Sequence, residues 1–350
     1  MKALNFFRQK KACALDVGQS WAKVALLTPA RKGVSLERIG RLVWDRGERD
    51  KKDQVVGKLN ALWRNLALRD KTVVSSMAGH AVIIKRVDLP SSEISNLDEN
   101  IYSHAKQFIP FDIEDVFLDY QVMGPGSEED TQNVLLVASK KKVVQEQLKL
   151  FEKAGLEAAA IDVDGFALSN CFEYNYPELA DKPSYLLDIG ATHGVFCVYS
   201  NKQPIFIRDV SFGGQQVTER LAKALEKKQA EAEKIKIAGG NGLNKEQQEE
   251  MQRQMDRIFS TWSEEIQRLI NFYLRSQEQP QTAEKLFLSG GGSLMTGLSR
   301  IFSEQLGLEI SHLDPWRNIS WNDNKIDSTY LRSVGPQFAI ATGLALRTVT

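Results

Sequence analysis

The chain has 350 residues, of which 42% are hydrophobic and 26% are charged, a balance typical of a folded protein with room for two compact domains. Its 45 Lys and Arg residues match its 45 Asp and Glu residues, so no overall positive charge favours nucleic acid or an anionic membrane surface. There is no run of about 18 apolar residues that could span a bilayer, and residues 1–11 lack the apolar core of a secretory signal. We therefore expect a cytoplasmic protein that binds no nucleic acid.

Several common kinds of site are excluded by the sequence. The three cysteines, Cys13, Cys171 and Cys197, have no CxxC spacing and two lie in apolar runs, which predicts buried free thiols without a disulfide or a zinc site. No HExxH, GxSxG or GxxxxGK(S/T) motif occurs, so a zinc peptidase, a nucleophile-elbow hydrolase and a P-loop are disfavoured.

Two short strings of similar sequence stand out, Asp-Val-Gly-Gln-Ser at residues 16–20 and Asp-Ile-Gly-Ala-Thr at residues 188–192. Each lies between two apolar, strand-like runs, which predicts a β-hairpin in each half of the chain. The glycine allows a tight turn with exposed amides, the Ser or Thr adds a hydroxyl, and the Asp adds a carboxylate. One such turn is more often structural, but two copies favour a duplicated phosphate-binding turn. The candidate phosphate contacts are Asp16, Gly18, Gln19, Ser20, Asp188, Gly190, Ala191 and Thr192.

Further elements of the first half follow from periodicity. After the first hairpin, an amphipathic helix at residues 55–68 and a strand at residues 72–77 are predicted. Residues 80–155 then read as strand, helix, strand, strand and helix, with a capping signal at Leu89-Pro90-Ser91-Ser92. We expect this β-α-β-β-α block to be a small inserted subdomain.

The second half is expected to be richer in helix. After the second hairpin, a charged helix at residues 215–237 precedes a longer helix whose apolar residues recur every three or four positions from Met251 to Tyr273. A strand at residues 286–289 leads into three consecutive glycines and a helix through Leu306, followed by a polar loop at residues 318–328. The last helix carries small residues that allow close packing against another backbone. The stripe on the long helix is expected to be core, with a partner-recruiting coiled coil as the alternative.

This order of elements resembles the actin-like ATPase fold, an α/β fold in which two duplicated lobes surround a nucleotide cleft. More closely, the chain resembles the PilM family of type IV pilus assembly proteins over nearly its whole length. The matching motifs are Leu15-Asp16-Val17-Gly18 with Ser20 and Lys23, Arg208-Asp209 before Gly213-Gly214, Ala232-Glu233 with Lys236, Leu288-Ser289-Gly290-Gly291-Gly292, Asp314-Pro315, and residues 339–347.

The resemblance divides the chain into alternating lobe segments. They are residues 1–79 and 156–184 of the first lobe, the inserted partner-binding subdomain 80–155, residues 185–214 and 284–332 of the second lobe, its helical subdomain 215–283, and a closing segment 333–350 that returns to the first lobe.

ATP and Mg²⁺ are the ligands that the resemblance implies. Two hairpins facing each other would place Asp16 and Asp188 beside a triphosphate, where two like charges about 4 Å apart repel by roughly 4 kcal/mol at an effective dielectric near 20. Because Mg²⁺ keeps most of its waters, we assign both carboxylates to the metal mostly through water. The alternative is that each Asp only closes its own turn.

Other nucleotide contacts are implied in the same way. Lys23, five residues beyond Gly18, could reach a phosphate or lie exposed on its strand. A glycine-rich strand-to-helix turn lets a base or a phosphate approach the backbone closely. Glu233 and Lys236 meet the ribose and base by resemblance, or form an ordinary surface ion pair. The further candidate contacts are Gly213, Gly214, Gly290, Gly291 and Gly292.

Hydrolysis is less well supported than nucleotide binding. The stretch at residues 161–167 corresponds to the segment that orients the attacking water in actin-like ATPases, so Asp164 and Asp162 are the candidate catalytic residues. PilM-like proteins usually carry Glu where Asp164 stands, and Asp is one methylene shorter. Gln19 and Trp21 also depart from the small residues usual in the first hairpin. We therefore expect nucleotide binding and, at most, a weak ATPase.

The resemblance implies a partner, the N-terminal cytoplasmic peptide of the membrane protein PilN. PilM-like proteins bind this peptide in a groove between the inserted subdomain, residues 80–155 here, and the first lobe. Phe108, Ile109 and Phe111 are candidate apolar anchors, although core packing explains them equally well. Residues 5–11 are apolar and then basic, too short to anchor stably in a membrane. The implied role is to link the inner-membrane complex, at its cytoplasmic face, to cytoplasmic machinery, with possible homo-oligomers.

Two alternatives stay open at this point. A small-molecule kinase of the same superfamily would need an acceptor site, and no motif for one is evident. An FtsA-like filament protein would carry an amphipathic C-terminal anchor, whereas this sequence stops directly after the expected closing helix.

Overall fold

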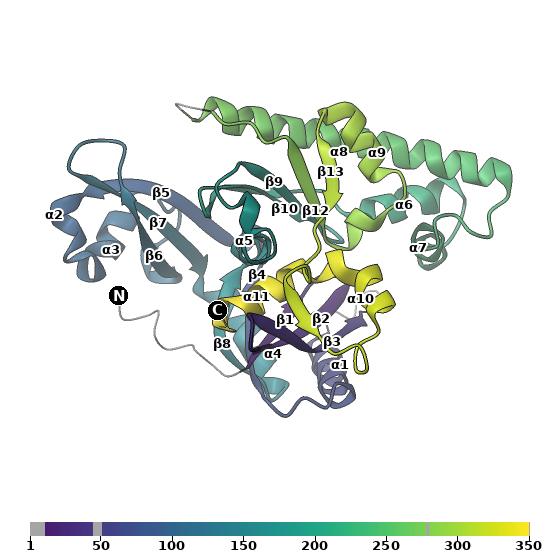
Figure 1. Cartoon of the computed structure of the whole chain (residues 1–350), viewed down its shortest axis with the longest axis horizontal. Coiled ribbons are helices and arrows are strands. Elements are labelled where there is room, and N and C mark those ends of the chain that lie inside the picture. Colours follow the sequence, from purple (N-terminus) through teal and green to yellow (C-terminus); the bar gives the residue numbers. More distant parts are fainter. Residues whose placement is uncertain (1–10, 45–50, 278–279, 350) are drawn as a thin grey trace.

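The computed structural model describes residues 11–44, 51–277 and 280–349, so the basic segment expected at residues 5–11 lies almost wholly outside the described residues. The fold is α/β and contains two lobes, each built on its own sheet, and a smaller subdomain that projects from one side (Figure 1). In the part of the chain that the structure describes, no helix is both long and apolar enough to cross a membrane.

A six-stranded sheet forms the centre of the first lobe, with strand order β14-β3-β2-β1-β4-β8. Buried apolar side chains of α1 and α4 pack against one face, and α5 and α11 cover the other. Its elements are β1 Ala12–Val17, β2 Trp21–Pro29, β3 Val34–Val43, α1 Lys52–Asn65, β4 Thr72–Met77, η1 Gly79–Ala81, α4 Lys141–Lys153, β8 Glu157–Val163, α5 Asp164–Asn175, η3 Pro177–Leu179, β14 Ile319–Trp321 and α11 Ala339–Val349.

The second lobe has a five-stranded sheet in the order β11-β10-β9-β12-β13. The long helix α8 lies along its outer side in Figure 1 and buries the predicted stripe, including Met251, Trp262 and Tyr273. The elements are β9 Ser184–Ile189, β10 Gly194–Ser200, β11 Gln203–Val210, α6 Gly214–Ala224, α7 Gln229–Ile237, α8 Lys245–Arg275, β12 Lys285–Ser289, η4 Gly291–Leu294, α9 Leu298–Leu306 and β13 Glu309–His312.

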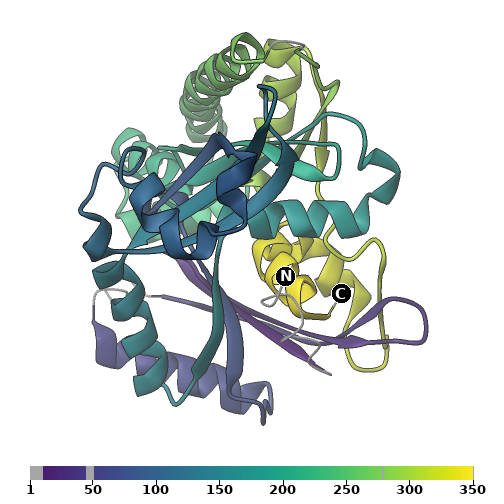
Figure 2. The same ribbon diagram turned by 90° about the vertical axis from the view of Figure 1, so that its left-hand side faces the viewer.

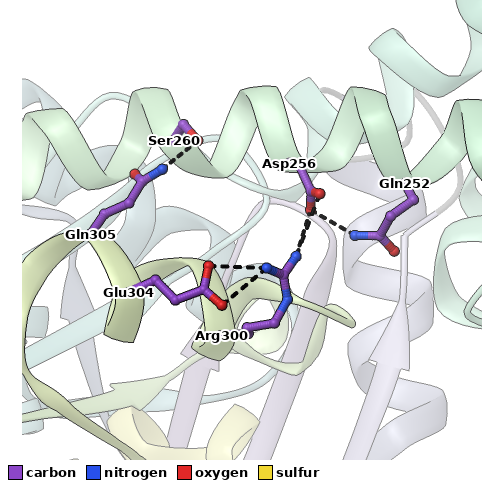
Figure 3. A network of polar contacts seen from close by, with 6 residues as sticks. All are labelled: Gln252, Asp256, Ser260, Arg300, Glu304 and Gln305. Carbon is purple, nitrogen blue, oxygen red and sulfur yellow. Dashed lines mark hydrogen bonds and ion pairs between the residues drawn. The ribbon is translucent and has the colours of Figure 1, made fainter.

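A polar network holds α9 against α8 on the surface of the second lobe (Figure 3). The Arg300 guanidinium donates to both Glu304 on its own helix and Asp256 on α8, and Gln305 donates to Ser260 at 2.7 Å. These side chains are largely exposed, so the network adds orientation rather than much stability.

The projecting subdomain is a three-stranded antiparallel sheet, β5-β7-β6, with short helices on one face (Figure 2 looks onto it). Its core includes Ile101, Val116 and Leu136. The following helix α4 buries Leu150 and Phe151 in the core of the first lobe instead. The subdomain elements are β5 Val82–Pro90, α2 Ser91–Ile94, α3 Leu97–Ala105, η2 Ile113–Asp115, β6 Val116–Pro125 and β7 Thr131–Lys140.

The last segment of the chain joins the two lobes through α10 Ser328–Val334, η5 Gly335–Phe338 and α11. As expected for a small-residue helix, α11 crosses α5 closely: a Cβ added at Gly343 would lie 1.7 Å from the Ala167 carbonyl oxygen. No side chain larger than hydrogen fits at that crossing.

Besides the placement of α4 in the first lobe, three details differ from the sequence-based expectations. The helix predicted at residues 215–237 is two helices, α6 and α7, because the chain turns between them with Glu226 at φ 52°. The loop expected at residues 318–328, within the range 284–332 that was assigned to the second lobe, contains β14. This strand pairs in parallel with β3 of the first-lobe sheet and buries its apolar Ile319 there. The helix after the glycines is interrupted at Met295 and restarts beyond Gly297, which has φ 88°.

Candidate active site

The two predicted hairpins have the same backbone design. In the first, Asp16 lies opposite Lys23 and the Gly18 amide donates to the Trp21 carbonyl at 2.9 Å. In the second, Asp188 lies opposite Val195 and the Gly190 amide donates to the His193 carbonyl at 3.0 Å. The structure therefore confirms two hairpins of one type, one from each lobe.

The hairpin residues differ in exposure at the turn. Gln19 and Thr192 are exposed, and Ser20 and Ala191 are half-buried. Trp44 secures the first turn, since its indole donates to the Gly18 carbonyl at 3.0 Å and its amide donates to the Ser20 carbonyl at 2.9 Å. The turn backbone is thus held from behind, and its Gln19 side chain faces solvent.

Charged groups from both lobes meet between the hairpins. The Lys23 ammonium lies 2.7 Å from an Asp16 carboxylate oxygen, and both side chains are largely buried. Burial lowers the pKa of Lys23, but Asp16, Asp188 and Asp164 together raise it above its usual value. Lys23 therefore forms an ion pair with Asp16 and interacts electrostatically with Asp164 and Asp188, and we call these three carboxylates, Asp16, Asp164 and Asp188, the carboxylate cluster.

The single positive charge of Lys23 does not balance the three carboxylates of this cluster. Burial and the neighbouring Asp16 raise the pKa of Asp164 to about 7. Burial also raises the pKa of Asp188 to about 6, against the opposing effect of Lys23. Buried like charges of this kind favour a proton or a cation at the site.

Two serines that were not among the candidate site residues complete the cluster, although Ser289 lies in one of the matching motifs. The Ser76 hydroxyl donates to Asp164 at 2.6 Å, and the Ser289 hydroxyl donates to Asp188 at 2.8 Å. Both serines lie at the carboxyl ends of strands, β4 and β12, that run parallel to β1 and β9. A polar residue ending an apolar strand-like run was the available signal.

The cluster does not form a direct metal cage. Among the described residues, no three His, Cys, Asp or Glu side chains are grouped as ligands of one ion. The excess negative charge still fits a divalent cation that keeps most of its waters, because Mg²⁺ is commonly held by one or two carboxylates together with phosphates.

Backbone contacts fix the second turn against the start of α6. The Gly214 amide donates to the Gly190 carbonyl at 3.0 Å, and the Gln215 amide donates to the Ala191 carbonyl at 2.7 Å. A Cβ at Gly213 would lie 2.6 Å from the Ala191 carbonyl carbon, so this approach needs glycine. The start of α6 thereby lies at the second hairpin.

Glu233 and Lys236 form a polar group on α7 that points back to α6. The Lys236 ammonium lies 2.7 Å from Glu233 and donates to the Gly214 carbonyl at 2.9 Å and to Thr218 at 2.8 Å. Lys236 is 9% exposed, so the pair is part of the α6–α7 contact as well as of the surface.

The three glycines after β12 serve different ends. Gly290 has φ 80°, and a Cβ there would lie 2.3 Å from the Ile189 carbonyl oxygen, so the turn packs tightly on the second hairpin strand. A Cβ at Gly292 would lie 2.4 Å from an Ile189 methyl. By contrast, a Cβ added at Gly291 would have no atom within 4 Å, and this residue is exposed.

The two candidate catalytic residues lie in different environments. Asp164, at the start of α5, belongs to the carboxylate cluster. Asp162 is 4% exposed and pairs at 2.7 Å with Arg347 near the end of α11. Asp162 therefore joins the closing helix to β8, and only Asp164 lies with the hairpin carboxylates.

The three candidate partner anchors are also separated by burial. Ile109 is 4% exposed and Phe108 packs on the same subdomain core. Phe111 is 40% exposed, with the Lys140 ammonium 4.0 Å from its ring centroid. Phe111 is thus the one of the three that offers an apolar ring at the surface.

Comparison with known proteins agrees with this geometry. A solved PilM-PilN type IV pilus biogenesis complex matches with 25% identity and a TM-score of 0.85, over 98% of this chain and 99% of that chain. EutJ, an ethanolamine utilization protein from Carboxydothermus hydrogenoformans, matches at 12% identity and TM-score 0.55, over 98% and 92% of the two chains. MreB5 of Spiroplasma citri bound to ADP matches at 12% identity and TM-score 0.50, over 96% and 95%.

These likenesses confirm the actin-like ATPase fold. The family model described as type IV pilus assembly protein PilM matches residues 14–349, which is almost the entire chain. This chain belongs to the PilM family of type IV pilus assembly proteins.

Proposed function

We propose that this protein is a nucleotide-binding adaptor of type IV pilus assembly, which binds ATP with Mg²⁺ between its lobes and captures the N-terminal peptide of a PilN partner. The observation that carries the nucleotide half is the carboxylate cluster with Lys23, because residues 172 positions apart meet there as a buried charged site. An actin-like relative, MreB5, has been solved with ADP.

Each group around the cluster has a role in this proposal. The Gly18 and Gly190 amides close their own turns, so the amides of the following turn residues and the Lys23 ammonium hold phosphate oxygens, with the hydroxyls of Ser20 and Thr192 as further donors. The open backbone at Gly291 admits the base, and Glu233 with Lys236 borders the sugar and base.

Mg²⁺ fits the charge of this site. Asp16 and Asp188 would hold the ion through its waters, and the ion would offset the burial and the repulsion by Asp16 that raise the pKa of Asp188 and Asp164. Bound Mg²⁺ supplies charge neutralisation for the phosphates. We further propose Asp164, held by Ser76, as the residue that orients a water for slow hydrolysis.

The partner half of the proposal uses exposed groups along α4 and beside its first turn. Phe111 and Phe117 are exposed beside Lys140 and Lys141 at the start of α4. Along the same helix, Leu148 reaches an open hollow of about 630 Å³ between α4 and the edge strand β8, which is lined by Gln145, Leu148, Lys149, Glu152, Leu156, Glu157 and Ala158.

This surface suits a short extended peptide. Exposed aromatic rings provide anchors, the lysines provide charge contacts, and an edge strand offers unpaired backbone groups. The PilM-PilN complex is the relative that supports PilN as the partner. Binding PilN would hold the protein at the cytoplasmic face of the inner membrane.

Calorimetric titration of ATP with and without Mg²⁺ tests the nucleotide half. Wild type is compared with Asp16→Ala and with Asp53→Ala, a control carboxylate whose side chain is 97% exposed. We expect Mg²⁺-dependent binding for wild type and Asp53→Ala and at least a tenfold loss for Asp16→Ala. Equal binding by all three proteins contradicts this site.

A second experiment tests the partner half with a synthetic PilN N-terminal peptide. Phe111→Ala should weaken capture at least tenfold, whereas Tyr102→Ala, which removes a similarly exposed ring from α3, should not. Capture is then repeated with saturating ATP and Mg²⁺. If Asp16→Ala captures the peptide as well as wild type under both conditions, nucleotide control of capture is wrong although the adaptor role survives.

A further inference from the structure

Arg41 connects the first hairpin to the last segment of the chain by contacts that the nucleotide site does not require. Arg41 lies directly opposite Lys23 in the β2–β3 pairing, so both cations share one face of the sheet. Its guanidinium carbon lies 4.6 Å from the ring centroid of Trp21, the residue that ends the first turn, and 5.9 Å from that of Tyr330. Its Nη1 donates to the Gln337 side-chain oxygen, 296 positions away.

The chain of contacts continues into the other lobe through one adjacent residue. Pro336, next to Gln337 in η5, accepts a hydrogen bond from the Gly290 amide at 2.8 Å. Gly290 begins the glycine turn and packs against Ile189 at the second hairpin. Two neighbouring residues of η5 thus contact Arg41, which lies beside the first turn, and Gly290, which begins the glycine turn of the other lobe.

The chemistry of Arg41 suits this position. A planar guanidinium can stack on an indole and donate sideways to an amide oxygen at once, which a lysine ammonium does not do. The buried core of this region is made by other residues, such as Phe338 and Leu344. Arg41 therefore fixes the orientation of η5 relative to the first turn more than it stabilises the fold.

We propose that Arg41 is a positioning residue that couples the first hairpin turn to the glycine turn through Trp21, Gln337 and Pro336. Filling the first turn with phosphate would then set the Gly290–Gly291 backbone for the rest of the nucleotide. This proposal rests on the proposed nucleotide binding, but its structural half can be measured without any ligand.

Hydrogen exchange at the Gly290 amide tests the structural half. Arg41→Ala and Gln337→Leu break the chain of contacts from opposite ends, and each should speed exchange of Gly290 at least about threefold. Arg38→Ala is the matched control, because Arg38 lies on the same strand and its hydrogen bond goes to the carbonyl of neighbouring Glu37. Unchanged exchange in both variants, or equal acceleration in Arg38→Ala, overturns the proposal. If Arg41→Ala does not fold, Gln337→Leu decides the result alone.

A mutant cycle on ATP affinity tests the functional half. Ser20→Ala alters the first turn and Gly291→Ala alters the glycine turn where a methyl has room. In the wild-type background, we expect the loss of ATP affinity in the double variant to differ from the product of the two single losses by at least about threefold. In the Arg41→Ala background, the double loss should equal that product. A purely structural role of Arg41 would lower affinity without changing additivity.

The outcomes separate this proposal from the nucleotide proposal. Additive losses in wild type, or non-additivity that persists in Arg41→Ala, overturn the coupling while leaving nucleotide binding intact. No ATP binding by wild type overturns both proposals, whatever the exchange at Gly290 shows.

Discussion

The two hairpins have the same main-chain geometry, but their aspartates have different cross-strand neighbours. Asp16 lies opposite a lysine, Lys23, whereas Asp188 lies opposite an apolar residue, Val195. Burial raises the pKa of Asp188, and two groups oppose that rise: Lys23 of the other lobe, through its charge, and Ser289, which donates a hydrogen bond to the carboxylate. The two turns thus share one backbone geometry, and the single ammonium of Lys23 interacts with the aspartates of both.

The supports behind the turns differ in the same way. The first turn is secured by the side chain of Trp44, and the second by backbone bonds from the start of α6. The first support is lost with the Trp44 side chain, whereas the second requires glycine at Gly213, where a Cβ would lie 2.6 Å from the Ala191 carbonyl carbon. The two turns therefore depend on different single residues.

Lys23→Met should have the largest effect. It leaves Asp16 buried without its cation, and we expect a loss of about 3 kcal/mol in the free energy of unfolding at pH 8, measured by urea denaturation. The loss should shrink toward pH 5 as the carboxylates take up protons.

The double variant Asp16→Asn with Lys23→Met provides the control for that loss. It removes both charges, so we expect it to recover much of the stability that Lys23→Met loses. A double variant as unstable as Lys23→Met would mean that packing of the lysine stem, not its charge, supports the first hairpin.

Asp188→Asn should act in the opposite direction. Folding raises the pKa of Asp188 to about 6 and that of Asp164 to about 7, so the folded state holds protons that the unfolded chain has released. Stability without nucleotide should fall as pH rises from about 4 to about 7 and level off above that.

Removing the Asp188 charge should therefore stabilise the ligand-free protein at pH 8 by up to about 2 kcal/mol, with no gain near pH 4. Melting temperatures across this pH range provide the measurement, and Mg²⁺-ATP binding should weaken in the same variant. A wild type that becomes more stable between pH 5 and 7, or an Asp188→Asn variant less stable than it at pH 8, contradicts the contrast between the hairpins.

Much of this comparison was accessible from the sequence. The repeated Asp-hydrophobic-Gly strings gave both hairpins and both carboxylates, because turn chemistry is local. The PilM family and the actin-like fold followed from motif order. The β14 strand was missed because its three residues pair with β3, 285 positions earlier, and carry no periodicity of their own.

The site was harder to predict where contacts are not local. Ser76 reaches Asp164 across 88 positions, and Arg41 reaches Gln337 across 296 positions. Only the fold brings such pairs together. The same applies to Asp162 and Asp164, which the sequence left as alternatives. In the structure Asp162 forms an ion pair with Arg347, and Asp164 belongs to the carboxylate cluster.

The smallest expected effect compares the two serines that hold the carboxylates. Ser289 is fully buried, so Ser289→Ala leaves an Asp188 oxygen without its donor and without water, and we expect a loss of about 1 kcal/mol at pH 8. Ser76 is half-buried, and water can replace its hydroxyl beside Asp164, so Ser76→Ala should lose about half as much. Both losses, measured by urea denaturation, should diminish at pH 5. If Ser76→Ala is the more damaging change, the second hairpin is not the half that depends on a single hydroxyl, and Lys23 must neutralise Asp188 more fully than its ion pair with Asp16 implies.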